Sequence, residues 1–317
     1  MSKLKFLGFL FAFLIFSGIF NESEALVYQM AGGPSGGTFI IYSKGIAKLA
    51  KNNRLGLKSN SSGGSIDNIQ KVETGRVGFG IAYSGHVYEA INGKLKDDSK
   101  KFENIMVIGY LYGAPAQLGV KAESKINSVK QINKFKISIG NKGSGAAATG
   151  ELFFKEMGIW DKNEFVYYGY KQSIRNFIKD KIDAFWLFTG FPNPSVKKAA
   201  NKKDIVLINT YLDAEAAGYF KKYPYFSKVI IPANTYKNVS QDTITFQDSA
   251  LFIVNKTIPA EVVYSLTKII YCDEGLHELA KVHKAAKKLS INDATNGIIT
   301  PFHPGAVKYF KEKGIMK

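Results

Sequence analysis

Short apolar runs alternate with longer stretches of helical period along most of the chain, a pattern typical of an α/β architecture. The run at residues 26–30 predicts a strand, and residues 38–52 predict a helix. Apolar side chains lie along one face of this helix and lysines lie elsewhere on it. The apolar positions are Phe39, Tyr42, Ile46 and Leu49, and the lysines are Lys44, Lys48 and Lys51.

The same plan of strand, loop and helix recurs further along the chain. A helix starts near Ser65, whose hydroxyl is placed to cap it, and is followed by a strand at residues 77–81 and a helix that ends at Gly93. Residues 136–140 predict a strand that leads into a helix ending at Gly158. The later predicted elements are a helix near 174–178, a buried strand at 182–188, a strand at 251–254, a helix over 262–270, and a helix that starts at Pro304, just after His303, and ends at Gly314.

Three glycine-bearing loops precede predicted helices, at residues 32–37, 63–65 and 143–145. Such a loop offers unpaired backbone amides and the positive end of a helix dipole, so it can hold a carboxylate or a phosphate without a charged side chain. One loop of this kind is also explained by turn geometry alone. Three in one chain favour a site for an anion.

The first residues have the three-part layout of a secretory signal. Lys3 and Lys5 precede an apolar run at residues 6–20, and small residues at Ser23 and Ala25 predict cleavage after Ala25. The alternative is a membrane anchor kept on the protein, for which the run is short, because a spanning helix needs roughly 20 apolar residues. We expect an exported, periplasmic protein.

The amino-acid composition argues against several kinds of site. The hydrophobic fraction of 45% indicates a globular chain, and Cys272 is the only cysteine, so no intrachain disulfide can form. The four histidines include no pair at the three- or four-residue spacing of a helical metal site, and we expect no metal and no cofactor. The net charge of +17 attracts anions of many kinds. Its lysines are scattered along helices, which indicates solvated surface rather than a nucleic-acid site, while adhesion to an acidic surface stays open.

A secreted serine hydrolase is the main alternative reading. Residues 33–37 match the G-x-S-x-G nucleophile motif around Ser35, with His303 downstream. Only one predicted strand precedes Ser35, whereas the motif normally stands inside an assembled sheet. A nucleotide-binding enzyme is disfavoured because no phosphate-binding Gly-x-x-x-x-Gly-Lys motif occurs.

Six stretches match a known family in the right order over nearly the whole predicted mature chain. They are residues 32–38, 60–68 (NSSGGSIDN), 77–88, 137–158, 183–194 (DAFWLFTGFPNP) and 301–314 (PFHPGAVKYFKEKG). In these stretches the chain resembles the TAXI family, the solute receptors of tripartite ATP-independent periplasmic (TRAP) transporters.

The resemblance implies a type II periplasmic-binding fold, with two α/β lobes joined by crossover strands around a ligand cleft. Residues 26–113 and 247–317 would form the first lobe, and residues 114–246 the second. It implies a receptor without catalytic activity, which gives a small anionic solute to the membrane subunits of a TRAP transporter. We expect a monomer. The ligand-facing residues that it implies are Ser35, Gly36, Gly37, Thr38, Phe39, Ser65, Tyr83, Ser84, Ser144, Gly145, Thr149, Trp186, Phe188, Thr189 and Gly190.

Three departures from the family pattern bear on the ligand. The chain has Tyr83-Ser84-Gly85, Tyr112-Gly113-Ala114 and Gly143-Ser144-Gly145-Ala146 where the family usually shows Gln-Ser-Asp, Tyr-Pro-Glu and Gly-Ser-Gly-Thr. Two acidic side chains are therefore missing, and a buried ammonium group without a carboxylate partner is costly. We expect an acid without an amine, with an apolar or aromatic part against Tyr83 and Trp186.

Overall fold

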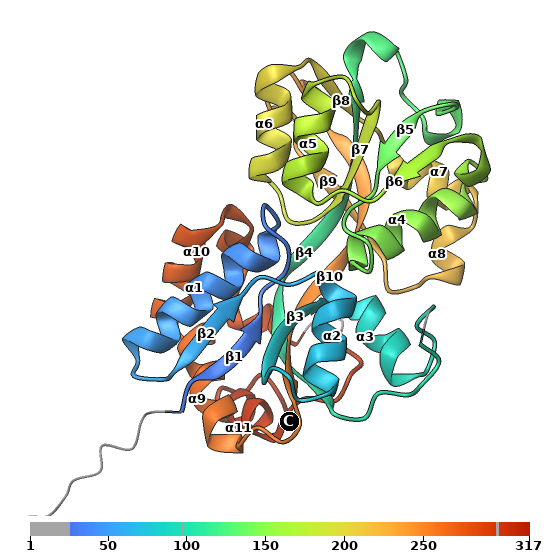
Figure 1. The fold of residues 1–317 in the computed structure, drawn as a ribbon. Helices are drawn as coiled ribbons and strands as arrows, with labels where there is room; N and C mark the ends of the chain where they lie inside the picture. The colour runs from blue at the N-terminus through green and yellow to red at the C-terminus, as the bar shows by residue number, and fades with distance from the viewer. Residues whose placement is uncertain (1–25, 97, 296–297) are drawn as a thin grey trace, which may run out of the picture.

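The computed structural model describes residues 26–96, 98–295 and 298–317, which form two α/β lobes joined by a pair of long strands (Figure 1). The predicted signal segment, residues 1–25, lies outside the described residues. Within the described part, no helix has both the length and the hydropathy that crossing a bilayer requires.

The first lobe is built on a sheet with the strand order β2-β1-β3-β10-β4. Its first three strands are parallel, and β10 runs antiparallel to both of its neighbours. The strands are β1 (Tyr28–Ala31), β2 (Leu57–Asn60), β3 (Phe79–Tyr83), β4 (Ile105–Lys121) and β10 (Thr243–Asn255). The helices are α1 (Thr38–Asn52), α2 (Ser65–Glu73), α3 (Ser84–Ile91), α9 (Ala260–Tyr271), α10 (Asp273–Val282) and α11 (Pro304–Glu312).

The second lobe repeats this plan. Its strands lie in the order β6-β5-β7-β4-β8, again with three parallel strands and one long antiparallel strand between the third and the last. The strands are β5 (Lys136–Ser138), β6 (Glu164–Val166), β7 (Ala184–Phe188), β8 (Ile205–Leu207) and β9 (Ser227–Ile231), the last of which pairs with β10. The helices are α4 (Gly145–Glu156), α5 (Tyr170–Ile178), α6 (Pro194–Lys202), α7 (Thr210–Ala216) and α8 (Tyr219–Lys222).

Two crossover strands, β4 and β10, join the lobes. They pair antiparallel from Gln247 opposite Pro115 to Asn255 opposite Ile105, and each also pairs with strands of the second lobe. The expected changes of lobe at Gly113 and Gln247 fall inside these two strands. The predicted two-lobed α/β fold with crossover strands is therefore confirmed.

The hydrophobic pattern explains which face of each helix packs on the sheets. On α1 the predicted apolar face is buried, and Lys44, Lys48 and Lys51 are exposed. All five residues of β3 and all five of β7 are buried, as expected for strands covered by helices on both faces. Parallel strands in each sheet end at one edge, so the helices that follow them begin at the edge facing the other lobe (Figure 1).

Candidate functional site

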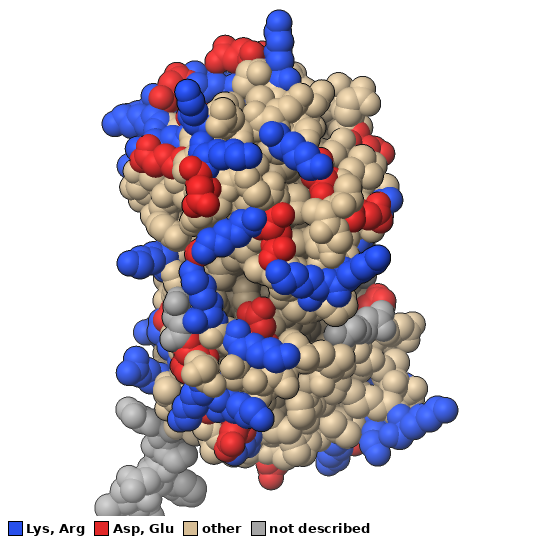
Figure 2. Space-filling model, turned by 90° about the vertical axis from the view of Figure 1, so that its right-hand side faces the viewer, with Lys and Arg blue, Asp and Glu red and all other residues tan. Residues whose placement is uncertain are grey.

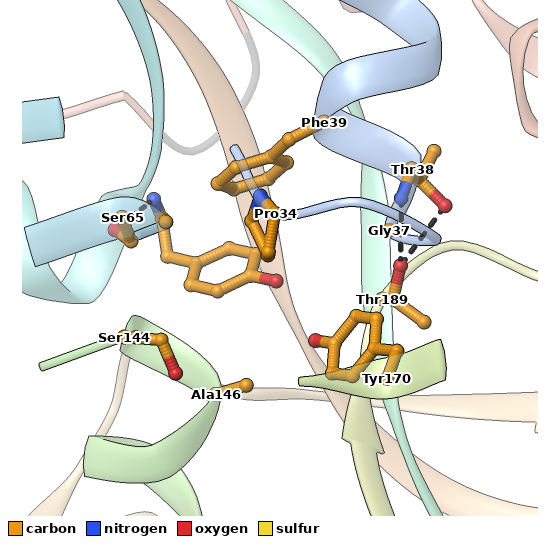
Figure 3. Close-up of a pocket in the computed structure, with 12 residues that line it drawn as sticks. Pro34, Gly37, Thr38, Phe39, Ser65, Ser144, Ala146, Tyr170 and Thr189 are labelled. Atoms are coloured by element: carbon orange, nitrogen blue, oxygen red, sulfur yellow. Dashed lines mark hydrogen bonds between the residues drawn. The ribbon is translucent and has the colours of Figure 1, made fainter. Parts of the chain in front are cut away.

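A small cavity lies where the amino ends of helices from both lobes meet (Figure 3). Its volume of about 20 Å³ has room for roughly one water molecule. None of its lining residues has a charged side chain. The lining residues are Pro34, Gly37, Thr38, Phe39, Gly64, Ser65, Tyr83, Ser144, Gly145, Ala146, Tyr170 and Thr189.

The amino end of α1 is held by the opposite lobe. Gly37 precedes this helix and has no side chain to cap it. The Thr38 N–H instead donates to Thr189 Oγ1 at 3.1 Å, and Thr189 Oγ1 donates in turn to Thr38 Oγ1 at 2.9 Å (Figure 3). The hydroxyl of Thr189 therefore occupies the position at which an anion would accept from α1.

The amino ends of α2 and α4 face each other across the same junction. A Cβ on Gly145 would lie only 2.6 Å from the Cβ of Ser65, so the absence of a side chain lets the two lobes approach. Ser144 caps α4 by accepting the Ala147 N–H at 3.1 Å.

The predicted cap at Ser65 is wrong. Gly64 is the N-cap residue of α2, and the Ser65 hydroxyl accepts the Tyr83 N–H at 2.9 Å instead. Ser65 is the first residue of α2 rather than the residue before the helix, so its hydroxyl does not cap the helix. Ser65 therefore fixes the end of β3 at the edge of the cavity.

Two tyrosines close the apolar side of the cavity. The hydroxyls of Tyr83, from the first lobe, and Tyr170, from the second, both donate to the carbonyl oxygen of Phe188. Burial raises the pKa of Tyr83 well above its usual value, so its hydroxyl stays protonated. The Phe39 ring packs on Tyr83 with 4.8 Å between the ring centroids.

Two ionisable groups lie behind the cavity wall. Asp248 on β10 accepts from Ser84 Oγ at 2.5 Å and from the Gly85 N–H at 3.1 Å, at the start of α3. Burial raises the pKa of Asp248 to about 7. His86 Nδ1 lies 3.2 Å from Ser65 Oγ, and burial lowers the pKa of this histidine to about 4, which keeps it neutral.

The structure brings together the predicted residues Gly37, Thr38, Phe39, Ser65, Tyr83, Ser144, Gly145 and Thr189 around the cavity. The other predicted residues have different places. Ser35 is exposed, Gly36 O accepts weak hydrogen bonds from Asn193 and Ser195, Gly190 O accepts from Thr38, and Ser84 binds Asp248. Thr149 is buried along α4, and the Trp186 ring lies in the core and donates to Ala146 O at 3.0 Å. Phe188 does not line the cavity, but its carbonyl accepts from Tyr170 and its ring packs edge-on against Tyr83 at 5.0 Å between centroids.

Four lining residues were not predicted: Pro34, Gly64, Ala146 and Tyr170. Three of them adjoin predicted positions in the same loops or helix ends. Tyr170 is different, because the apolar period of α5 was recognised only from Ile174 onward. The Gly169 that precedes the helix was the available signal, since it follows the strand β6 as the other glycine loops follow theirs.

The arrangement does not support the serine hydrolase alternative. Ser35 is exposed and does not line the cavity, while His303 Nδ1 accepts the Gly305 N–H at 3.3 Å as the cap of α11. Across the described ranges, no group of three metal-binding side chains comes together.

A profile of the NMT1-like family matches residues 30–314, which is almost all of the described chain. The chain belongs to the NMT1-like family. The matched residues of this NMT1-like protein include both lobes and all the lining residues of the small cavity.

Several solved structures are similar to this NMT1-like protein. A protein of Bordetella bronchiseptica RB50 is 15% identical, with a TM-score of 0.51 over 92% of this chain and 89% of that chain. Lactococcal OpuAC, complexed with glycine betaine, is 14% identical with a TM-score of 0.49 over 90% of this chain and 96% of that one. The periplasmic aliphatic sulphonate binding protein SsuA of Escherichia coli is 11% identical with a TM-score of 0.46, over 90% of this chain and 82% of that one. At these identities the likeness concerns the fold.

Proposed function

We propose that this NMT1-like protein is an extracytoplasmic solute receptor that closes its two lobes on a small carboxylate. The observation on which the proposal rests is the meeting of helix amino ends from both lobes, α1 and α2 with α4, around one uncharged cavity. Backbone amides at helix amino ends bind anions through partial positive charge, so a binding site needs no basic side chain there.

The cavity walls favour an acid without an amine. A ligand ammonium group would need a carboxylate, and none lines the cavity. Asp248 already accepts from Ser84, Gly85 and Ser249. The apolar part of the ligand would lie against Tyr83, as the sequence suggested, with Phe39 and Tyr170 in place of the expected Trp186, whose ring lies in the core.

Binding requires the lobes to separate, because the cavity has room for little more than one water molecule. The closed arrangement is held by polar contacts between the lobes, among them the Lys96–Glu151 ion pair at 2.5 Å and the hydrogen bond from Tyr225 to Glu89 at 2.9 Å. We propose that the first lobe comprises residues 26–113 and 247–317, and that opening bends β4 and β10 near these boundaries. The ligand would then replace the Thr189 hydroxyl at α1.

The remaining parts of the proposal follow the TAXI resemblance. The protein would work as a monomer, without cofactor, and would present its ligand to the membrane subunits of a TRAP transporter. Residues 1–25 would direct export to the periplasm and be removed. Mass spectrometry of the exported protein should give a chain that starts at Leu26, and a chain that keeps residues 1–25 would mean a retained anchor.

A thermal-shift screen of amino acids, dicarboxylates and aromatic acids tests the receptor function. A ligand at 100 times its dissociation constant should stabilise the folded protein by about 2.7 kcal/mol. We expect the strongest shifts from carboxylates without an amine. Micromolar binding of glutamate, with the amine-free acids inert, would contradict the ligand class, and no shift with any anion would contradict the receptor itself.

A further inference from the structure

A second cavity, larger and open to solvent, lies between the lobes and shares no lining residue with the small cavity at the helix ends. Its volume is about 750 Å³. Pro192 and Lys197 line it from the second lobe, and the remaining lining residues belong to α10 and the turn after it in the first lobe. Figure 1 shows α6, which contains Lys197, and α10 on the same side of the molecule.

The polar side chains of this cavity are all basic. Its ionisable lining residues are Lys197, His277, Lys281, His283, Lys284 and Lys287, with no aspartate or glutamate among them. Lys281 pairs with Glu278 at 2.5 Å, just outside the cavity wall. Among residues 26–96, 98–295 and 298–317, no carboxylate lies within ion-pair distance of Lys197, Lys284 or Lys287. Most of the positive charge in the cavity is therefore not compensated by the protein.

His283 adds a buried donor that has no acceptor. Its side chain is only 7% exposed, and its Nδ1 accepts the Ala285 N–H at 3.0 Å. The proton of the neutral ring is therefore on Nε2. Nε2 is buried without a hydrogen-bond partner, which is a costly state for a donor. Burial, together with the charge of Lys197, lowers the pKa of His283 to about 4, so the ring is neutral at physiological pH.

We infer that this cavity is a second binding site, specific for a phosphate-bearing anion. A phosphate group offers several acceptor oxygens and a charge near −2, which suits a pocket lined by lysines from both lobes better than a single carboxylate does. The volume leaves room for a group attached to the phosphate, either the rest of a lipid headgroup or a soluble molecule. The site shares no lining residue with the small cavity and goes beyond the proposed receptor function.

The site also bears on closure of the lobes. Lys197 comes from the second lobe, while Lys284 and Lys287 come from the first, so closure brings like charges to one cavity. These lysines are exposed, and like charges that approach each other repel, by an amount that solvent and salt reduce. A phosphate bound between them would offset the repulsion and favour the closed arrangement.

Titration of the full protein with inorganic phosphate, followed by NMR of the histidine side chains, tests the site. In the wild type we expect the His283 Nε2 resonance to move and saturate, and sodium chloride at matched ionic strength to leave it in place. The K197Q/K284Q variant should bind phosphate at least about tenfold more weakly. The K130Q/K162Q variant loses the same charge from exposed lysines elsewhere, and its affinity should stay within about twofold of the wild type.

Vesicle flotation distinguishes the two sources of phosphate. Binding to phosphatidylglycerol vesicles but not to phosphatidylcholine, lost in K197Q/K284Q and kept in K130Q/K162Q, would assign the site to a lipid headgroup. Phosphate binding without vesicle binding would assign it to a soluble phosphate. The inference is overturned if neither probe binds, if chloride moves His283 equally, or if the two double variants behave alike. Both probes are tested without a cleft ligand, so failure of this inference is distinct from failure of the receptor proposal.

Discussion

Asp248 is a fully buried carboxyl group whose pKa is raised to about 7, mainly by burial. An unfolded aspartate has a pKa of about 3.9. Between these values the folded protein holds a proton that the unfolded chain has lost. The free energy of unfolding should therefore fall as the pH rises through this window.

We predict that the Asp248→Asn variant removes this dependence. Relative to the variant, the wild type should lose up to about 1.4 kcal/mol of unfolding free energy per pH unit between roughly pH 4 and pH 7. Urea denaturation of both proteins at several pH values measures the difference. Asp161→Asn changes an exposed residue and is the control, whose curve should run parallel to the wild type. Parallel curves for Asp248→Asn as well would show that Asp248 titrates normally.

At the scale of single residues, the sequence predicted which residues lie near the cavity better than it predicted where their side chains point. Tyr83 was expected to lie against the ligand, and it ends β3 and lines the cavity. Ser84 and Trp186 were expected to face the ligand, but Ser84 binds Asp248 and Trp186 packs in the core. A strand that is buried on both faces shows no alternation of apolar and polar residues. Its sequence therefore does not indicate which side chains point into the cleft.

The amino end of α4 shows how one element controls the contact between the lobes. A Cβ on Gly145 would lie 2.6 Å from the Ser65 Cβ and 2.9 Å from the His86 ring. Alanine is a better helix former than glycine, so Gly145→Ala should not weaken α4 itself. The obstruction is therefore confined to the approach of α4 to α2 and α3.

We predict that Gly145→Ala binds the cleft ligand at least about tenfold more weakly, because full closure is blocked by the added methyl group. Calorimetry with the best acid from the thermal-shift screen measures the affinity. Circular dichroism should show an unchanged fold. Wild-type affinity in a variant that is correctly folded would mean that closure on the ligand leaves room for a methyl group between α4 and the first lobe.

Element boundaries followed the hydrophobic period closely where it was strong. The predicted helix at residues 38–52 matches α1, and Pro304 starts α11 with His303 as its cap. The strand β2 was not predicted, because its sequence LKSN has a single buried apolar residue. Strands β4 and β10 run through both lobes and were recognised only in part, since their length depends on pairing with distant strands.

At the scale of the whole molecule, the sequence predicted the same succession of strand, loop and helix in two parts of the chain. The strands of the two lobes lie in equivalent orders, β2-β1-β3-β10-β4 and β6-β5-β7-β4-β8. The closed contact between the lobes could not be predicted. It joins Thr38 to Thr189, which are 151 positions apart, and a few hydrogen bonds decide whether the lobes meet.

The charged side chains behind the high net charge are spread over the surface of both lobes (Figure 2). Figure 2 shows Lys and Arg over both lobes with Asp and Glu between them, and this face has no separate basic stripe. The solvated surface that the sequence predicted is consistent with this view. Selectivity for an anion must then come from local sites, where amides or lysines converge.

The most direct test of the account is a crystal structure of the protein with the best acid from the screen. We expect one carboxylate oxygen within hydrogen-bond distance of the Thr38 N–H, in the place of Thr189 Oγ1, and the amino end of α4 on the other side of the same ligand. An acid bound away from these helix ends, or held by lysine side chains on one lobe alone, would contradict it.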